Sequence, residues 1–150
     1  MTDMPITPRF ALPLLAVAQA QKEVTHNEAL TLLDALVHAT VEGGPLATPP
    51  ANPVAGECWV VGAAPAGAWA GRGNAIAIWT SGGWRFTVPR EGMRVIRIVD
   101  GARLRFEGGA WVEPAMVAAP ADGSVVDSEA RSAIAALIAQ LVAEGILISG

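Results

Sequence analysis

The sequence predicts an α+β protein with a central antiparallel β-meander, an N-terminal helical segment and a C-terminal oligomerising helix. The strongest observation is a repeated phrase, WTSGGW at residues 79–84 and FEGGAW at residues 106–111, in which a Gly pair lies between two aromatic residues. Glycine adopts the positive φ of tight hairpin loops, so each phrase predicts a hairpin with facing aromatic side chains. The 16 Gly and 11 Pro residues, placed between short apolar runs, indicate many turns. Apolar stripes at helical spacing on both sides of this region predict the two helices.

Composition limits the class of protein. A chain of 150 residues has room for one compact domain with flanking elements. It has no run of about 18 apolar residues, which argues against membrane insertion. The net charge of −4 gives no reason to expect nucleic acid as a partner. Cys58 is the only cysteine, so we expect a buried, inert thiol and neither an intrachain disulfide nor a cysteine-based zinc site.

Residues 1–44 are predicted to be an extended and helical docking segment. Thr25 and Glu28 have the spacing of a capping box, and an apolar stripe follows them. These signals predict a helix over residues 26–40, which can continue a helical segment that begins near residue 16, and the glycine pair at 43–44 stops it. Residues 45–56 contain four prolines and are predicted to be a stiff, extended linker.

Residues 57–113 are predicted to be the antiparallel β domain, in which successive strands pair as a meander. The expected strands are 57–62, 75–79, 84–88, 93–99, 102–107 and 110–113. A loop rich in Gly, Ala and Pro over residues 63–74 carries Trp69. The dipeptide Asp100-Gly101 predicts a two-residue hairpin turn.

This turn predicts which residues share a face of the sheet. It places Val95 opposite Phe106 and gives a mostly apolar inner face. The outer face combines isoleucines with Arg94, Arg103 and Arg105. Because apolar stems that end in guanidinium groups suit an interface, we expect this face to meet a neighbouring subunit or a ligand.

The C-terminal part is predicted to be a loose linker over residues 114–124 and a helical segment over residues 125–150. Asp127 is a good N-cap, and Gly145 can end the helix in a left-handed conformation. The helix has an apolar stripe that either packs on the sheet or bundles with other copies, and the loose linker favours bundling. The residues expected to drive oligomerisation are Ile134, Leu137, Ile138 and Leu141.

No residue pattern indicates an enzyme, a metal site or a cofactor. The two histidines, His26 and His38, lie twelve positions apart without a ligand pattern, and ordinary surface histidines are expected. Carboxylates are scattered, and nothing in their spacing selects a pair for glycoside hydrolysis. Ser81 lies in a turn and lacks the context of a catalytic serine. We therefore expect no catalytic residue.

Ligand contacts are expected from aromatic and arginine side chains. Trp69, in its glycine-rich loop, is either a core residue or a residue that stacks on a sugar. The cluster of Arg94, Arg103 and Arg105 suits an acidic polysaccharide or carboxylates on an adjacent subunit, and solvated strand charges are the plainer alternative. These four residues form the candidate glycan-binding set.

The segment LPLLAVAQAQKEVTHNEAL, residues 12–30, together with LDAL at residues 33–36 and GAWAG at residues 67–71, resembles a known family. It is similar to an uncharacterised domain of alphaproteobacterial prophage and gene transfer agent fibre and spike proteins. The resemblance implies a trimeric virion appendage that is made in the bacterial cytoplasm and contacts the host surface. It implies particle docking through Gln19, Gln21, Lys22 and Asn27, and no catalytic residue is carried over.

The sequence thus predicts a structural attachment protein, a tail fibre or head spike component of a phage or gene transfer agent. Its expected partners are further copies of the chain, other virion proteins and host surface polysaccharide. One alternative is a monomeric carbohydrate-binding module, whose C-terminal helix would pack on its own sheet. The other is a polysaccharide hydrolase, which would need a convergent pair of carboxylates.

Overall fold

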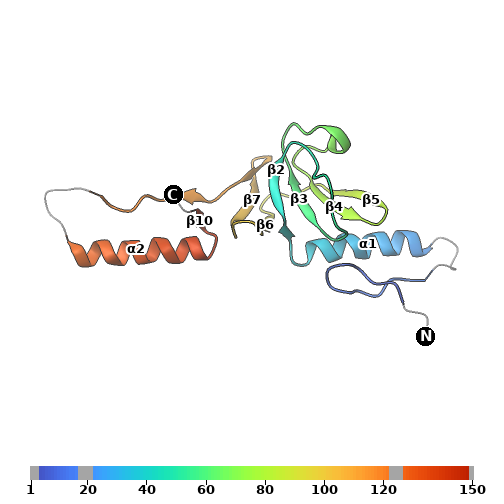
Figure 1. Cartoon of the computed structure of the whole chain (residues 1–150), viewed down its shortest axis with the longest axis horizontal. Coiled ribbons are helices and arrows are strands. Elements are labelled where there is room, and N and C mark those ends of the chain that lie inside the picture. Colours follow the sequence, from blue (N-terminus) through green and yellow to red (C-terminus); the bar gives the residue numbers. More distant parts are fainter. Residues whose placement is uncertain (1–3, 17–21, 122–126, 149–150) are drawn as a thin grey trace.

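The computed structural model describes residues 4–16, 22–121 and 127–148 (Figure 1). Helix α1 (Lys22–Leu36) precedes the strands, and helix α2 (Ser128–Ala143) follows all but the last of them. The predicted α+β class, with a helix at each end of a β region, is confirmed. No helix in the described part of the chain is long and apolar enough to span a membrane.

Helix α1 includes residues before the predicted cap and ends earlier than predicted. Thr25 is inside its first turn, so the predicted capping box at Thr25 and Glu28 does not begin the helix. The helix ends at Leu36, four residues before the predicted end, because the chain then enters strand β1 (Thr40–Val41). Pairing of this strand with a distant one overrides the helical spacing of the preceding apolar residues.

The strands form two four-stranded sheets. We call β2-β3-β4-β5 the Trp sheet and β1-β6-β7-β8 the Arg sheet. The Trp sheet contains β2 (Gly43–Leu46), β3 (Cys58–Val61), β4 (Ile76–Thr80) and β5 (Gly83–Thr87). The other strands of the Arg sheet are β6 (Arg94–Arg97), β7 (Arg103–Glu107) and β8 (Ala110–Val112). A short 3-10 helix, η1 (Gly67–Trp69), lies in the loop between β3 and β4.

The predicted single meander is therefore two three-stranded meanders, β3-β4-β5 and β6-β7-β8. Each has a short parallel strand added at one edge, β2 beside β3 and β1 beside β6. The connection from β5 to β6 contains the buried Pro89, which has no N–H to donate to a sheet ladder. The first residues of the predicted proline-rich linker, Pro45 and Leu46, lie in β2.

Both aromatic hairpins are confirmed. Trp79 pairs with Trp84 across β4 and β5, with ring centroids 4.8 Å apart. Phe106 pairs with Trp111 across β7 and β8, with centroids 5.4 Å apart. The repeated phrase thus marks one hairpin in each sheet.

The β6–β7 hairpin has a longer loop than predicted. Val95 lies opposite Leu104 and not Phe106, and residues 98–102 connect the strands. The Asp100 carboxylate accepts hydrogen bonds from Arg97 and from the Ala102 N–H, which stabilises the wider turn. Because the pairing shifts by two positions, the residues stay on their predicted faces.

The Trp sheet is covered on both faces, and the Arg sheet on one. One core cluster lies between the sheets and includes Val60, Ile78 and Leu104, with Ala35 of α1. A second cluster, on the other face of the Trp sheet, contains Trp59, Trp69, Trp79 and Trp84. The outward face of the Arg sheet packs against neither cluster.

The structure corrects the assignment of Trp69 as a ligand-binding residue. Its side chain is fully buried, and its ring lies edge-on to that of Trp84 at 5.2 Å. The loop that carries it folds over the aromatic cluster, so no face of the ring is open to a sugar. Trp69 is a core residue.

The N-terminal segment is bound to α1 by polar contacts. The buried Asp34 carboxylate accepts hydrogen bonds from the Thr7 hydroxyl at 2.7 Å and from the backbone N–H groups of Arg9 and Phe10, both at 2.9 Å. The Arg9 guanidinium donates to the carbonyl oxygens of Ala35 and Thr40. Residues 5–14 form a small hairpin with a bridge between Ile6 and Pro13.

Helix α2 stands away from both sheets (Figure 1). It begins at the predicted N-cap Asp127, whose side chain accepts a hydrogen bond from the Ala130 N–H, and the chain then turns through Gly145 at φ 66°. None of its described residues is buried. After it, β10 (Leu147–Ile148) pairs in parallel with β9 (Ala115–Met116), two short strands that the sequence did not predict.

Replacing Asp34 by Ala should destabilise the fold by about 3 kcal/mol, because it leaves two backbone N–H groups and a hydroxyl without their charged acceptor. Urea unfolding measures this change. The matched control is Glu28→Ala, which removes an exposed ion pair to Arg85 and should cost less than about 1 kcal/mol. Equal losses in the two variants would contradict the role of Asp34.

Replacing Trp69 by Ala should lower the free energy of unfolding by about 3–5 kcal/mol, because it empties the centre of the aromatic cluster. Thermal and urea unfolding measure the loss, and Trp69→Phe should restore part of it. A Trp69→Ala protein with unchanged stability and lost sugar binding would restore the ligand role.

Candidate functional site

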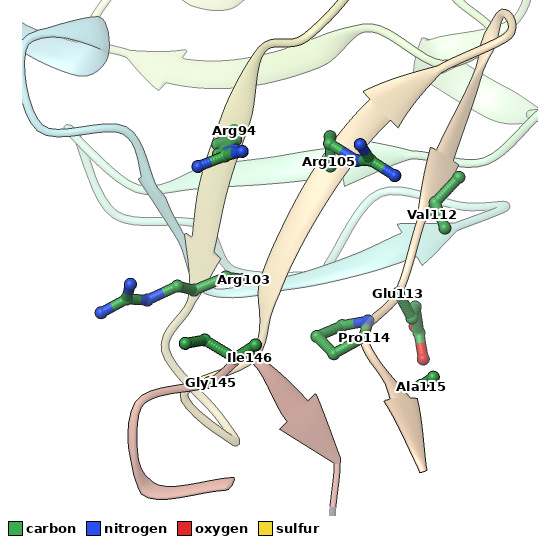
Figure 2. Close-up of a pocket in the computed structure, with 9 residues that line it drawn as sticks. All are labelled: Arg94, Arg103, Arg105, Val112, Glu113, Pro114, Ala115, Gly145 and Ile146. Carbon is green, nitrogen blue, oxygen red and sulfur yellow. The ribbon is translucent and has the colours of Figure 1, made fainter. Parts of the chain in front are cut away.

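The candidate site is the outward face of the Arg sheet. Arg94 on β6 lies directly opposite Arg105 on β7, and Arg105 in turn lies opposite Val112 on β8. One step along the sheet, Ile96 lies opposite Arg103. The period of two along each strand therefore places all three predicted arginines on one face. Figure 2 shows Arg94 and Arg105 on neighbouring strands, with Arg103 closer to the end of the hairpin.

These arginines line a cavity of about 560 Å³. Its opposite wall is formed by the chain segments before and after α2. These segments contribute Pro114, Ala115, Gly145 and Ile146 (Figure 2). Val112 and Glu113 complete the lining. The cavity therefore joins three guanidinium groups to a mostly apolar wall.

Two of the three arginines have acidic partners. Arg103 forms an ion pair with Glu144 at the end of α2, at 3.3 Å. Arg105 forms one with Glu107, two positions further along β7. Arg94 forms no ion pair with any residue in the described ranges 4–16, 22–121 and 127–148. The cavity thus contains one guanidinium group whose charge no described side chain balances.

Arg97 anchors the edge of the site. Its guanidinium donates to both Asp100 oxygens, to Glu113 at 2.5 Å and to the Gly44 carbonyl at 2.8 Å. Hydrogen bonds from Arg97 hold the pKa of Asp100 below its usual range, and those to Asp100 and Glu113 raise the pKa of Arg97. This cluster connects the Arg sheet to β2 of the Trp sheet, and sequence reasoning missed it because Gly44 and Glu113 lie far from Arg97 in the chain.

A second, more open hollow of about 500 Å³ lies beside this cluster. Glu42, Asp100 and Glu113 line it together with the edge of Trp59. Two of these carboxylates are bound by Arg97, so they are not free to act as an acid and a base. Among the described residues, no cluster of His, Cys, Asp or Glu could hold a metal ion.

Cys58 is the buried thiol that its apolar context predicted. Its side chain lies in the main core cluster, with Arg9 Nη1 3.5 Å from the sulfur. Burial raises the pKa of the thiol to about 11. Cys58 therefore stays protonated at neutral pH and offers no nucleophile.

The predicted docking residues have different outcomes. Gln19 and Gln21 lie outside the described residues, and Lys22 is the first residue of α1. The Asn27 amide is bound to the chain's own Leu15: its Oδ1 accepts from the backbone N–H at 2.9 Å and its Nδ2 donates to the carbonyl at 3.0 Å. Asn27 thus holds the N-terminal segment on α1, and its role in docking stays a prediction.

The predicted oligomerisation residues lie at the surface of α2. The exposed fractions are 43% for Ile134, 64% for Leu137 and 37% for Leu141. Ile138 is half-buried. The helix therefore keeps an open apolar stripe.

Residues 26–112 match a family described as a protein of unknown function (DUF2793). The match spans more than half of the chain, so the chain belongs to this family. No curated protein matches it. The resemblance to an uncharacterised family is confirmed, and the connection to phage or gene transfer agent particles stays a prediction.

The Arg97–Asp100 contact should make stability sensitive to acid. The pKa of Asp100 in the folded protein is below its ordinary value of 3.8. The stabilisation that the Asp100 carboxylate gives the fold is therefore fully present above pH 3.8 and is lost as the pH falls through the folded-state pKa. Asp100→Asn should therefore be less stable than wild type at about pH 7 and approach it at about pH 2.5, by urea unfolding at both pH values. A stability difference independent of pH would contradict this role.

Proposed function

We propose that this member of the DUF2793 family is a structural appendage protein, a tail fibre or head spike component of a phage or gene transfer agent particle. Copies of the chain assemble through α2, and the Arg sheet faces host surface polysaccharide. The observation that carries the proposal is the isolated, apolar helix α2.

Helix α2 is difficult to explain in a free monomer. Ile134, Leu137 and Leu141 follow the i, i+3, i+7 spacing of a coiled-coil seam and are all exposed. Burying such a side chain is worth about 1.5–3 kcal/mol, so three exposed ones are a strong drive to associate. The chain between Arg131 and Glu144 carries no charge, which would otherwise keep the helix solvated.

A trimer is the assembly that the sequence resemblance implies, and α2 supports self-association in general. Its alanine-rich composition lets neighbouring helices approach closely. The parallel β9–β10 pair and the hydrogen bond from the Arg103 N–H to the Gly145 carbonyl, at 3.1 Å, fix the end of α2 on the sheet. A bundle of α2 helices would therefore hold the β domains in a defined arrangement around it.

The N-terminal segment supports attachment to a second protein. Although Asp34 and Asn27 hold its backbone, it exposes Met4, Ile6 and Phe10, with exposed fractions of 62%, 57% and 48%. Apolar side chains on a segment fixed in this way suit a protein interface. This surface is a proposed contact to the particle in addition to Asn27.

A monomeric carbohydrate-binding module is the second candidate function, and the cavity beside the arginines favours it. Both candidates use the same face of the Arg sheet. They differ in α2. The appendage would bury its apolar stripe against other copies, whereas the monomeric module expected from the sequence would pack this helix on its own sheet. The described residues of α2 do not show such a packing (Figure 1). The mass of the protein in solution therefore separates them.

Replacing Leu137 and Leu141 together by Asp should dissociate the oligomer, because each charge falls on the apolar seam. Light scattering after size-exclusion chromatography, at several protein concentrations, measures the mass. The matched control is Ser132→Asp with Ala136→Asp, which adds the same charge on the opposite side of the helix and should keep the oligomer. A wild-type chain that is monomeric at every concentration would overturn the proposal.

A further inference from the structure

The charges around the cavity leave room for one negative charge. Glu144 balances Arg103, Glu107 balances Arg105, and Glu113 is bound by Arg97. Arg94, also in the lining, has no acidic partner among the described residues. A ligand with a single negative charge would neutralise Arg94. A densely charged polymer would be repelled by the carboxylates of Glu107, Glu113 and Glu144 nearby.

Arg94 and Arg105 are direct cross-strand neighbours. Like charges at such positions repel each other and disfavour the pairing of the two strands. An anion between them would remove this repulsion and accept hydrogen bonds from both guanidinium groups. A carboxylate fits this arrangement, because its two oxygens can each accept from one planar guanidinium.

The apolar wall of the cavity favours a ligand that carries an apolar surface beside its charged group. Pro114, Ala115 and Ile146 line this wall opposite the arginines, and Val112 lies beside Arg105 in the sheet (Figure 2). Apolar side chains of this kind pack against the C–H groups of a sugar ring. A volume of about 560 Å³ lies within the range of small-molecule sites and holds a ring with its carboxyl group.

We propose that this cavity binds the carboxylate of an acidic sugar, held between Arg94 and Arg105 with the ring against the apolar wall. The inference rests on the proposed function, because it names the chemical class of polysaccharide that the appendage recognises. Arg103 stays bound to Glu144 and borders the ligand.

The test uses the full chain and three probes: a trisaccharide that contains one galacturonic acid residue and two neutral sugars, the methyl ester of that residue in the same trisaccharide, and acetate. The ester keeps the size and ring chemistry of the trisaccharide and removes the charge. Calorimetry measures affinity, and NMR follows the Nε–Hε resonances of the arginines. We expect the acid to bind and to shift the Arg94 and Arg105 resonances, the ester not to bind, and acetate to bind more weakly than the acid.

Arg94→Gln should weaken binding of the trisaccharide about tenfold or more, because it removes a charged hydrogen-bond donor. The matched control is Arg90→Gln, which makes the same change at an exposed arginine outside the cavity and should leave the affinity unchanged. The melting temperature of each variant checks that it is folded, and Arg105→Gln gives a second, independent reduction.

Three results would overturn the inference. They are equal binding of the acid and the ester, equal losses of affinity in Arg94→Gln and in the control Arg90→Gln, and the absence of a resonance shift with both the acid and acetate. Binding that occurs only in the dissociated Leu137→Asp, Leu141→Asp protein would also overturn it, because a carboxylate of an adjacent subunit would then fill the cavity. The mass of the wild-type protein tests the proposed assembly separately, so the two proposals can fail independently.

Discussion

The arrangement of the β region depends on one buried carboxylate, that of Asp34. It binds the Thr7 hydroxyl and two backbone N–H groups of the N-terminal hairpin, near the end of α1. The hairpin in turn places Arg9 on the carbonyl oxygens of Ala35 and Thr40, where the chain leaves the helix and enters β1. β1 and β2 are the parallel edge strands of the two sheets. The contact therefore fixes the position of the chain where it enters these two edge strands.

The difference between the two sheets explains where the proposed ligand site lies. The Trp sheet is packed on both faces, so its tryptophans are used for stability. The Arg sheet has one open face, and there the alternation of the strands presents arginines in place of aromatic residues. The same hairpin phrase thus occurs in a structural sheet and in a sheet with a free surface.

Features that depend on neighbouring residues were predicted correctly from the sequence. Features that depend on contacts between distant residues were not. The hairpins at Trp79–Trp84 and Phe106–Trp111 follow from residues five positions apart, and the faces of β6 and β7 were correct although their register was not. Strands β1 and β2 carry no local strand pattern, and they form because distant strands offer them an edge. Trp69 illustrates the same limit, because the packing of its loop on Trp84 decided between core and ligand.

The cavity and helix α2, through which we propose assembly, share one structural element. Residues 144–146 end α2, and they also supply Gly145 and Ile146 to the cavity wall and Glu144 to Arg103. A Cβ at Gly145 would lie 2.2 Å from the Gly101 carbonyl oxygen, so the close approach of this turn to the β6–β7 loop requires glycine. In the proposed assembly, any force on α2 therefore acts first on this turn and on the wall of the cavity. The proposed assembly and the proposed ligand site would thus be coupled by the position of one turn against one sheet.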